Sequence, residues 1–172
     1  MSSAHCALSV FHLNIRSLNH NHSKLLLFLD TLQFKFDIIV LSEIWGYNID
    51  FYQNLMDGYD LIYKLPAKGN IGGIAMYISQ DLDALPLDKC FLSSGERNKV
   101  ESIFVKVKTK NRVFLVGAVY RHPNGDLAEF TNNLDILLNR LKREKVNTVI
   151  AGDLNINMIN FQASAAIESY LN

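Results

Sequence analysis

The stretch Val149–Asn157, VIAGDLNIN, is an apolar run that ends in a glycine followed by a carboxylate and an amide. Asp153 and Asn155 stand two positions apart, and alternate side chains of an extended strand point to the same face. An extended chain would therefore project both side chains from one side, where the strand ends. Asp, Asn and Gly are also common turn residues. The stretch is either a simple turn or one part of a polar site.

The first part of the chain has the pattern of a strand, a helix and a second strand. Ala7–Ile15 (ALSVFHLNI) and Asp37–Trp45 (DIIVLSEIW) are apolar runs that suit buried strands. Ser23–Phe34 (SKLLLFLDTLQF) has a helical pattern with Ser23 as its N-cap, and His20–His22 are expected in a polar loop before it. If the two strands lie parallel in one sheet, this β-α-β unit is right-handed.

The rest of the chain adds short strands and a second amphipathic helix. Strands are expected at 59–64 (YDLIYK), 72–79 (GGIAMYIS), 100–108 (VESIFVKVK) and 112–120 (RVFLVGAVY), the last two joined by a hairpin-length connection. Segment 125–145 has an apolar stripe at helical spacing, 147–153 (NTVIAGD) suits a buried strand, and 158–172 has a helical pattern. The sequence shows no repeats, so it predicts one α+β domain.

Composition narrows the class of protein without indicating a function. The 172 residues suffice for one domain, and 49% hydrophobic with 20% charged residues is typical of a globular protein. Lys plus Arg and Asp plus Glu are equal at 17, so net charge favours no partner. The start lacks the charged region of a signal peptide, and no apolar run approaches about 18 residues. We therefore expect no membrane segment and a location in the nucleus or cytoplasm.

Three of the expected strands end in an acid or an amide. Asn14 lies at the end of the first strand, Glu43 at the end of the second, and Asp153 with Asn155 at the end of the last. Ligand sites of layered α/β proteins gather beyond strand ends. Convergence would give an oxygen-lined pocket with two negative charges, which suits Mg²⁺, whereas Zn²⁺ is disfavoured because no His or Cys pair has suitable spacing. Each residue also has a local explanation, Asn14 as a turn cap and Glu43 as a satisfied edge residue.

A further polar group follows the strand in Gly117–Gly125, GAVYRHPNG. Tyr120 can donate a hydrogen bond to a phosphate oxygen, and Arg121 can bind a phosphate through two hydrogen bonds. His122 is a candidate for a catalytic role, although a single loop histidine is more often simply exposed.

These motifs occur in an order that resembles endonuclease/exonuclease/phosphatase (DNase I-like) domains. The matching segments are LNIRSL with Asn14, DIIVLSEIW with Glu43, then GGIAMYI, VYRHP and GDLNIN, which span roughly Val10 to Asn157. The chain is most similar to the apurinic-like endonuclease of non-LTR (LINE-type) retrotransposons. The resemblance implies an α/β/β/α sandwich of two mixed sheets flanked by helices, incomplete in this chain, and Mg²⁺-dependent phosphodiester hydrolysis of DNA, with Mn²⁺ as an alternative ion.

The resemblance also implies roles for individual residues. Glu43 matches the acidic metal ligand, and Asn14 matches an asparagine that helps to hold the metal and its surroundings. Tyr120 matches a tyrosine near the scissile phosphate. Asp153 matches the residue that positions or deprotonates the attacking water, and Asn155 matches a phosphate contact. Looser matches are Glu101, a supporting acid, and Arg121, which can equally be structural.

The sequence also departs from the family pattern. Relatives continue with a late Asp and a Ser-Asp-His segment, whereas no Asp follows Asp153 and no His follows His122. We therefore expect residues 1–172 to be a single domain without its C-terminal part, with little or no nuclease activity by itself. A missing C-terminal segment or a reverse transcriptase region is then an expected partner.

Other functions stay open at this point. The chain can be a non-catalytic remnant or interaction module that keeps the scaffold. It can also be a phosphoinositide phosphatase or a sphingomyelinase-like member of the same fold. A flavodoxin-like nucleotide binder is disfavoured because no Gly-rich loop follows the first strand.

Overall fold

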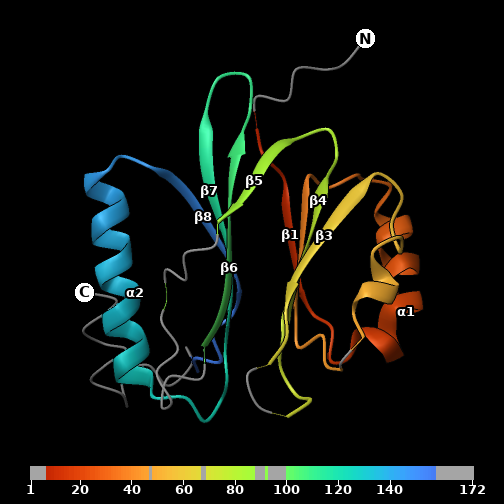
Figure 1. Cartoon of the computed structure of the whole chain (residues 1–172), viewed down its shortest axis with the longest axis horizontal. Helices are drawn as coiled ribbons and strands as arrows, with labels where there is room; N and C mark the ends of the chain where they lie inside the picture. The colour runs from red at the N-terminus through yellow and green to blue at the C-terminus, as the bar shows by residue number, and fades with distance from the viewer. Residues whose placement is uncertain (1–6, 47, 67–68, 88–91, 93–99, 158–172) are drawn as a thin grey trace.

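Two four-stranded sheets pack face to face, and each carries one helix on its outer side (Figure 1). The computed structural model describes residues 7–46, 48–66, 69–87, 92 and 100–157. Both sheets are mixed, with parallel and antiparallel pairs. The predicted α+β class and the four-layer α/β/β/α arrangement are confirmed.

The first sheet has the strand order β1-β2-β4-β3. Its strands are β1 (Val10–Asn14), β2 (Ile38–Ser42), β4 (Ile74–Ser79) and β3 (Tyr59–Lys64). β1 pairs parallel with β2 in a register that sets Asn14 opposite Ser42, whereas β4 is antiparallel to both of its neighbours. Helix α1 (Leu18–Leu32) connects β1 to β2, as predicted for a β-α-β unit, and the short 3₁₀ helix η1 (Asp50–Tyr52) precedes β3.

The second sheet has the strand order β5-β6-β7-β8. Its strands are β5 (Asp83–Leu87), β6 (Val100–Lys108), β7 (Val113–Arg121) and β8 (Asn147–Asp153). β6 and β7 form the predicted hairpin, and α2 (Leu127–Arg143) connects β7 to the parallel strand β8. The sequence did not predict β5, because Pro86 disfavours a strand except at an edge, and β5 is an edge strand.

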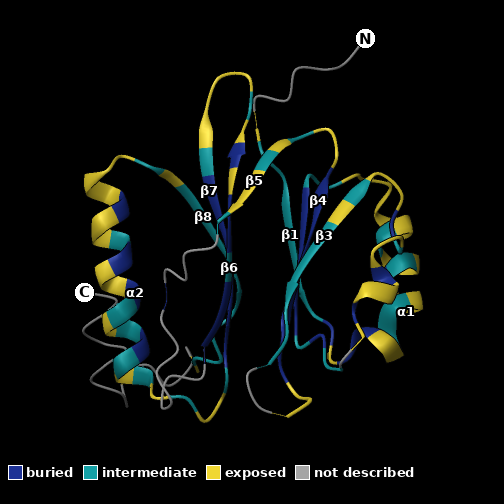
Figure 2. Ribbon diagram, viewed as in Figure 1, coloured by how far each residue is buried: buried dark blue, intermediate teal, exposed yellow. Residues whose placement is uncertain are grey.

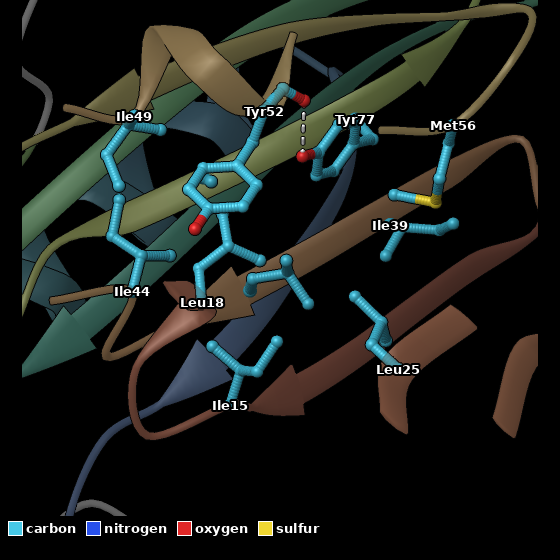
Figure 3. Packing of buried hydrophobic residues seen from close by; sticks show 11 residues of the cluster. Ile15, Leu18, Leu25, Ile39, Ile44, Ile49, Tyr52, Met56 and Tyr77 are labelled. Carbon is cyan, nitrogen blue, oxygen red and sulfur yellow. Dashed lines mark hydrogen bonds between the residues drawn. The ribbon is translucent and has the colours of Figure 1, made fainter. Parts of the chain in front are cut away.

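Burial follows the layers of the fold (Figure 2). β2 and β4 are buried along their whole length, since each is covered on both faces. One apolar cluster fills the space between the sheets, and two others lie under the helices. In the cluster under α1, the Tyr77 hydroxyl donates to the Tyr52 carbonyl at 2.9 Å, so a buried polar group is satisfied inside an apolar layer (Figure 3).

Helix α1 begins earlier than the sequence predicted. Its N-cap is Ser17, whose Oγ accepts from the His20 backbone N–H, so the cap predicted at Ser23 is wrong. His20–His22 therefore lie in the first turns of α1 and do not form a loop. The physical reason is packing: Leu18 and Leu25 are both buried from this helix, and Leu18 precedes the predicted start. The helix predicted over 158–172 lies outside the described residues.

Candidate metal and phosphate site

The carboxyl ends of three strands meet at one end of the sandwich. Asn14 is the last residue of β1, Glu43 directly follows β2, and Asp153 is the last residue of β8 in the other sheet. Because β1 and β2 are parallel, both end at the same edge. The Asn14 side chain contacts both acids, although 139 positions separate it from Asp153. The convergence expected from the sequence is present for these three residues.

Asn14 links the two acids through one amide group. Its Nδ2 donates to Glu43 Oε1 at 2.8 Å and to Asp153 Oδ2 at 2.7 Å. Carboxylates accept hydrogen bonds and do not donate, so the NH₂ end of the amide must face them. The amide oxygen accepts from the Arg16 backbone N–H at 3.3 Å. Asn14 therefore supports the two carboxylates in this arrangement, and a ligand role for its oxygen stays a prediction.

Tyr120 adds a buried hydroxyl to the same group. It is 1% exposed, and its Oη donates to Glu43 Oε1 at 3.3 Å. Burial is the main reason why the pKa of Tyr120 is raised, and the negative charge of Glu43 raises it further. The residue is therefore a neutral donor near pH 7, which is the form that can hydrogen-bond a phosphate oxygen.

The loops around the site have strained backbones. Glu43 and Asn155 have φ angles of 56° and 50°, in the left-handed region that residues other than glycine seldom adopt. Such conformations cost free energy and cluster at functional sites. The strain at Glu43 lies at the point where the chain leaves β2, so it decides where the Glu43 carboxylate projects.

Asn155 does not lie on an extended strand with Asp153. β8 ends at Asp153, and the Asn155 backbone N–H donates to Asp153 Oδ1 at 3.0 Å, which makes a local turn. The Asn155 side-chain Nδ2 donates to the Arg121 carbonyl at 2.6 Å. An extended strand through Asn155 is wrong, because the turn chemistry of Asp and Asn ends the strand; the turn that the sequence left open is present. A phosphate contact by Asn155 stays a prediction.

Arg121 binds backbone and is nearly buried. It is 4% exposed, and its guanidinium donates to the carbonyls of Leu154 at 2.7 Å, Asn155 at 2.6 Å and Gly125 at 2.8 Å. Burial lowers the pKa of Arg121, and the negative charge of Asp153 opposes that shift. These contacts fix the loop after β8 against the loop after β7. The geometry supports the structural alternative for Arg121 over a phosphate grip.

Glu101 supports the rim of the site from β6. The residue is 4% exposed; its Oε2 accepts from the Gly73 backbone N–H at 2.5 Å, and its Oε1 lies 3.1 Å from His122 Nε2. Gly73 in turn accepts a hydrogen bond from the Ile44 backbone N–H at 3.3 Å, next to Glu43. Glu101 therefore connects the second sheet to the loop that carries Glu43.

Sequence reasoning missed His12 as a neighbour of the site. His12 precedes Asn14 by two residues and lies on the same face of β1. Its Nε2 lies 3.1 Å from Ser42 Oγ. Burial lowers the pKa of His12, and the charge of Asp153 works in the opposite direction. The two polar residues at alternate positions of an otherwise apolar strand, His12 and Asn14, were the sequence feature that could have identified His12.

The chemistry of this group fits a small hard cation. Two carboxylates share one neutral amide, and neither has an ion-pair partner in the described part of the chain. Among the same residues, no three His, Cys, Asp or Glu side chains gather as a metal cluster. One or two carboxylates, completed by water, suit Mg²⁺ and not a closed zinc site. A metal-ligand role for Glu43 and Asp153 stays a prediction.

A sequence model of the endonuclease/exonuclease/phosphatase family matches residues 11–163, and this range contains every residue of the site. The chain belongs to this family. No curated protein sequence matches it significantly. None of the helices in the described segments is long and apolar enough to cross a membrane.

Several solved structures share the fold. D. rerio TDP2 in complex with a single-strand DNA product has a TM-score of 0.66 and 16% identity, over 96% of this chain and 65% of that chain. The endonuclease domain of TRAS1, a telomere-specific non-LTR retrotransposon, has a TM-score of 0.65 and 14% identity, over 95% and 69%. Mannosyl-6-phosphatase Bt3783 from Bacteroides thetaiotaomicron has a TM-score of 0.67 and 16% identity, over 96% of this chain and 70% of that chain. At these identities the likeness establishes the fold alone.

Proposed function

We propose that this member of the family is a Mg²⁺-dependent phosphodiester hydrolase domain that acts on DNA, of the type found in non-LTR retrotransposons. The observation that carries the proposal is the contact of Asn14 with both Glu43 and Asp153, joined by the Tyr120 hydroxyl. Mn²⁺ has the same preference for oxygen ligands and is an alternative ion. DNA as the substrate rests on the resemblance of the NIRSL and YRHP segments to the retrotransposon enzymes, because the fold also occurs in a phosphatase.

The proposed chemistry divides the work among four side chains. A Mg²⁺ ion held at Glu43 would polarise the phosphoryl oxygen and stabilise the leaving oxygen. Asp153 accepts a proton from the attacking water, whose oxygen forms the new bond to phosphorus as the ester bond breaks. Tyr120 donates a hydrogen bond to a phosphate oxygen. Asn14 holds the two carboxylates close together through its hydrogen bonds to both. The site thus acts by positioning and electrostatics.

We also propose that residues 1–172 alone turn over DNA slowly or not at all. The family's late Asp and Ser-Asp-His segment have no counterpart within them. A scaffold that binds the ion without hydrolysis would correspond to the non-catalytic alternative. Metal binding and catalysis must therefore be measured separately.

The metal-binding step is tested by calorimetric titration of Mg²⁺ into the full 172-residue chain. We expect Glu43→Gln to weaken binding at least about tenfold, because it removes one of two ligand charges. Asp57→Asn is the matched control, since Asp57 is an exposed acid outside the site. Equal affinities for the two variants would overturn the proposed metal site.

Catalysis is tested by plasmid nicking with Mg²⁺ or Mn²⁺. Nicking that disappears in Asp153→Ala would support the hydrolase and overturn the expected inactivity of this chain. Mg²⁺ binding without nicking would support the non-catalytic alternative.

A further inference from the structure

His122 lies beside the site and is held there by an acid. It follows the last residue of β7, and its ring centroid is 4.7 Å from that of Tyr120, in an edge arrangement with 66° between the planes. Its Nε2 lies 3.1 Å from Glu101 Oε1. The Glu101 side chain is 6% exposed, whereas the His122 side chain keeps 21% of its surface in contact with solvent. A buried carboxylate thus holds a ring that solvent and ligands can still reach.

The opposite sheet leaves space for this ring. A Cβ added at Gly72 would lie 2.7 Å from His122 Cε1 and 2.9 Å from Nε2, so a larger residue there would displace the imidazole. Gly72 has a φ of 115°, and its carbonyl accepts from the Trp45 backbone N–H at 3.0 Å. The loop that accommodates His122 is therefore bonded to the loop that carries Glu43. The positions of the histidine and of the proposed metal ligand are coupled through backbone.

The contact with Glu101 assigns different tasks to the two ring nitrogens. Because Nε2 faces a carboxyl oxygen, it carries the proton. Nδ1 is then the free nitrogen, and it has no hydrogen-bond partner among the described residues. When the ring is protonated, Nδ1 donates a hydrogen bond and the imidazole carries a positive charge. Both properties suit an anionic phosphate oxygen.

A purely structural explanation accounts for less of this arrangement. Glu101 already accepts a hydrogen bond from the Gly73 N–H through its other oxygen, so the buried carboxylate has a partner without His122. A structural histidine would also need no accessible surface. The contacts run without a break from Asp153 through Asn14, Glu43 and Tyr120 to His122. This places the free nitrogen at the far side of the same polar group.

We propose that His122 Nδ1 contacts a non-bridging oxygen of the phosphodiester, and that Glu101 is the positioning residue that fixes the ring. The inference rests on the proposed function, because it uses the same bound phosphate. It extends the site beyond Tyr120 to the residue that follows β7.

The test uses the full chain, Mg²⁺ and a 12-base-pair DNA duplex as the probe. Nitrogen-15 NMR of the imidazole rings follows the His122 signals, which are assigned by their loss in His122→Asn. We expect the Nδ1 signal of His122 to shift when duplex is added, and the affinity for duplex to fall about tenfold in His122→Asn. His22→Asn is the matched control, since the His22 ring nitrogen contacts only backbone carbonyls of its own helix.

Glu101→Gln tests the positioning role by a readout that packing alone would not move. Loss of the carboxylate should let the His122 proton distribute between Nε2 and Nδ1, which changes the two nitrogen shifts before any DNA is added. Circular dichroism of each variant confirms that it is folded.

The outcomes separate this inference from the proposed function. Duplex binding with an unmoved Nδ1 signal and unchanged affinity in His122→Asn would overturn the role of His122 alone. Should Mg²⁺ or duplex fail to bind the unchanged chain, the proposed function fails and this inference fails with it. If His122→Asn proves unfolded, His122→Gln takes its place both for the assignment of the His122 signals and for the affinity measurement.

Discussion

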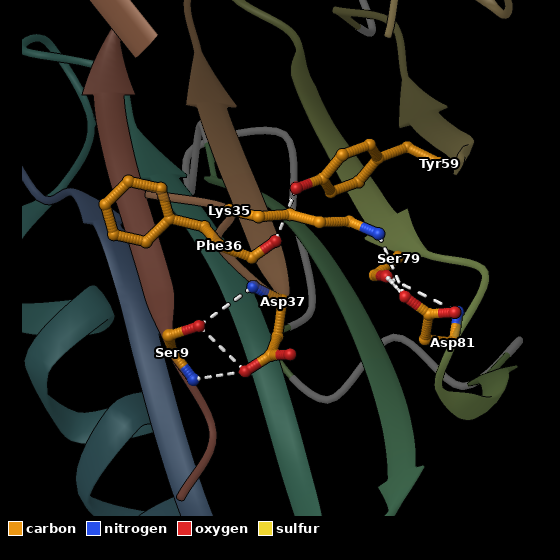
Figure 4. Close-up of polar contacts among 7 residues, drawn as sticks. All are labelled: Ser9, Lys35, Phe36, Asp37, Tyr59, Ser79 and Asp81. Carbon is orange, nitrogen blue, oxygen red and sulfur yellow. Dashed lines mark hydrogen bonds and ion pairs between the residues drawn. The ribbon is translucent and has the colours of Figure 1, made fainter. Parts of the chain in front are cut away.

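The two ends of the first sheet hold their acids in different ways. At the end where β1 and β2 begin, Asp37 Oδ2 accepts from both the backbone N–H and the hydroxyl of Ser9, each at 2.7 Å, and its own N–H donates back to Ser9 Oγ at 2.9 Å (Figure 4). Asp81 at the same end pairs with Lys35 at 2.9 Å. These acids are satisfied by donors of their own.

At the other end, two acids share one donor. Glu43 and Asp153 both accept from the Asn14 amide, and their further donors, the Tyr120 hydroxyl and the Asn155 backbone N–H, are neutral as well, so their mutual repulsion is only partly offset. The difference teaches how an acid at a strand end can be interpreted. An acid that stands apart and is held by the donors of one residue stabilises the fold, whereas two acids brought together on one neutral donor leave negative charge available for a cation.

The largest expected effect on stability is at Gly152, where the backbone of β8 lies close to that of β7. A Cβ at Gly152 would lie 1.7 Å from the Val119 carbonyl oxygen, and the residue has a φ of 155°. We expect Gly152→Ala to lower the free energy of unfolding by more than about 4 kcal/mol, because backbone must move. Gly69→Ala is the control, since Gly69 also has a positive φ but open space around it, and should cost about 1 kcal/mol. Urea denaturation measures both, and similar losses would contradict the close approach.

The comparison of the two ends is tested most directly by removing an acid from each. Asp37→Ala should lower the free energy of unfolding by about 2 kcal/mol, because the Ser9 donors lose a charged acceptor. Glu43→Gln should leave stability unchanged or raise it, since it removes repulsion with Asp153. Both are measured by urea denaturation without divalent ions. A larger loss for Glu43→Gln than for Asp37→Ala would refute the distinction.

A smaller effect is expected from acid pH at the site end. The pKa of His12 is lowered by burial from its usual 6.5. Below about pH 6.5 the unfolded chain therefore binds a proton that the folded chain does not, and stability falls as pH decreases. His12→Gln should lose less stability between pH 7.5 and 5.5, as followed by thermal unfolding in metal-free buffer. Equal losses in both proteins would show that His12 is not the responsible group.

The smallest effect is expected for the ion pair at the opposite end. The Lys35 and Asp81 side chains are 57% and 82% exposed, so solvent screens their attraction. Lys35→Met should change the free energy of unfolding by about 0.5 kcal/mol or less, and added salt should remove the difference. A loss that persists at high salt would indicate that Lys35 contributes by packing and not by charge.

The fold was largely predictable because its signals are local. The apolar runs predicted β1, β2, β8 and the β6–β7 hairpin. The helical periodicity predicted α2 with bounds close to those observed. The start of α1 was missed because Ser17 and Ser23 are equally good caps in isolation, and burial of Leu18 decides between them. β5 was missed because a proline weakens the strand pattern and pairing with β6 compensates for it.

The site was predictable as a set of residues and not as an arrangement. Asn14, Glu43 and Asp153 were identified from their places at strand ends, and they do meet. The direction of the Asn14 amide, the turn at Asn155 and the backbone contacts of Arg121 were not predictable, because each depends on partners far away in the sequence.

The sequence by itself determined which segments form strands and helices and which polar residues stand at strand ends, because periodicity and turn chemistry act over a few residues. Only the tertiary structure decided which acids come together on a shared donor. It also set the His122 ring between Glu101 and Gly72. The physical reason is that hydrogen bonding and repulsion between carboxylates depend on distances of about 3 Å, which the packing of two sheets fixes and local sequence does not.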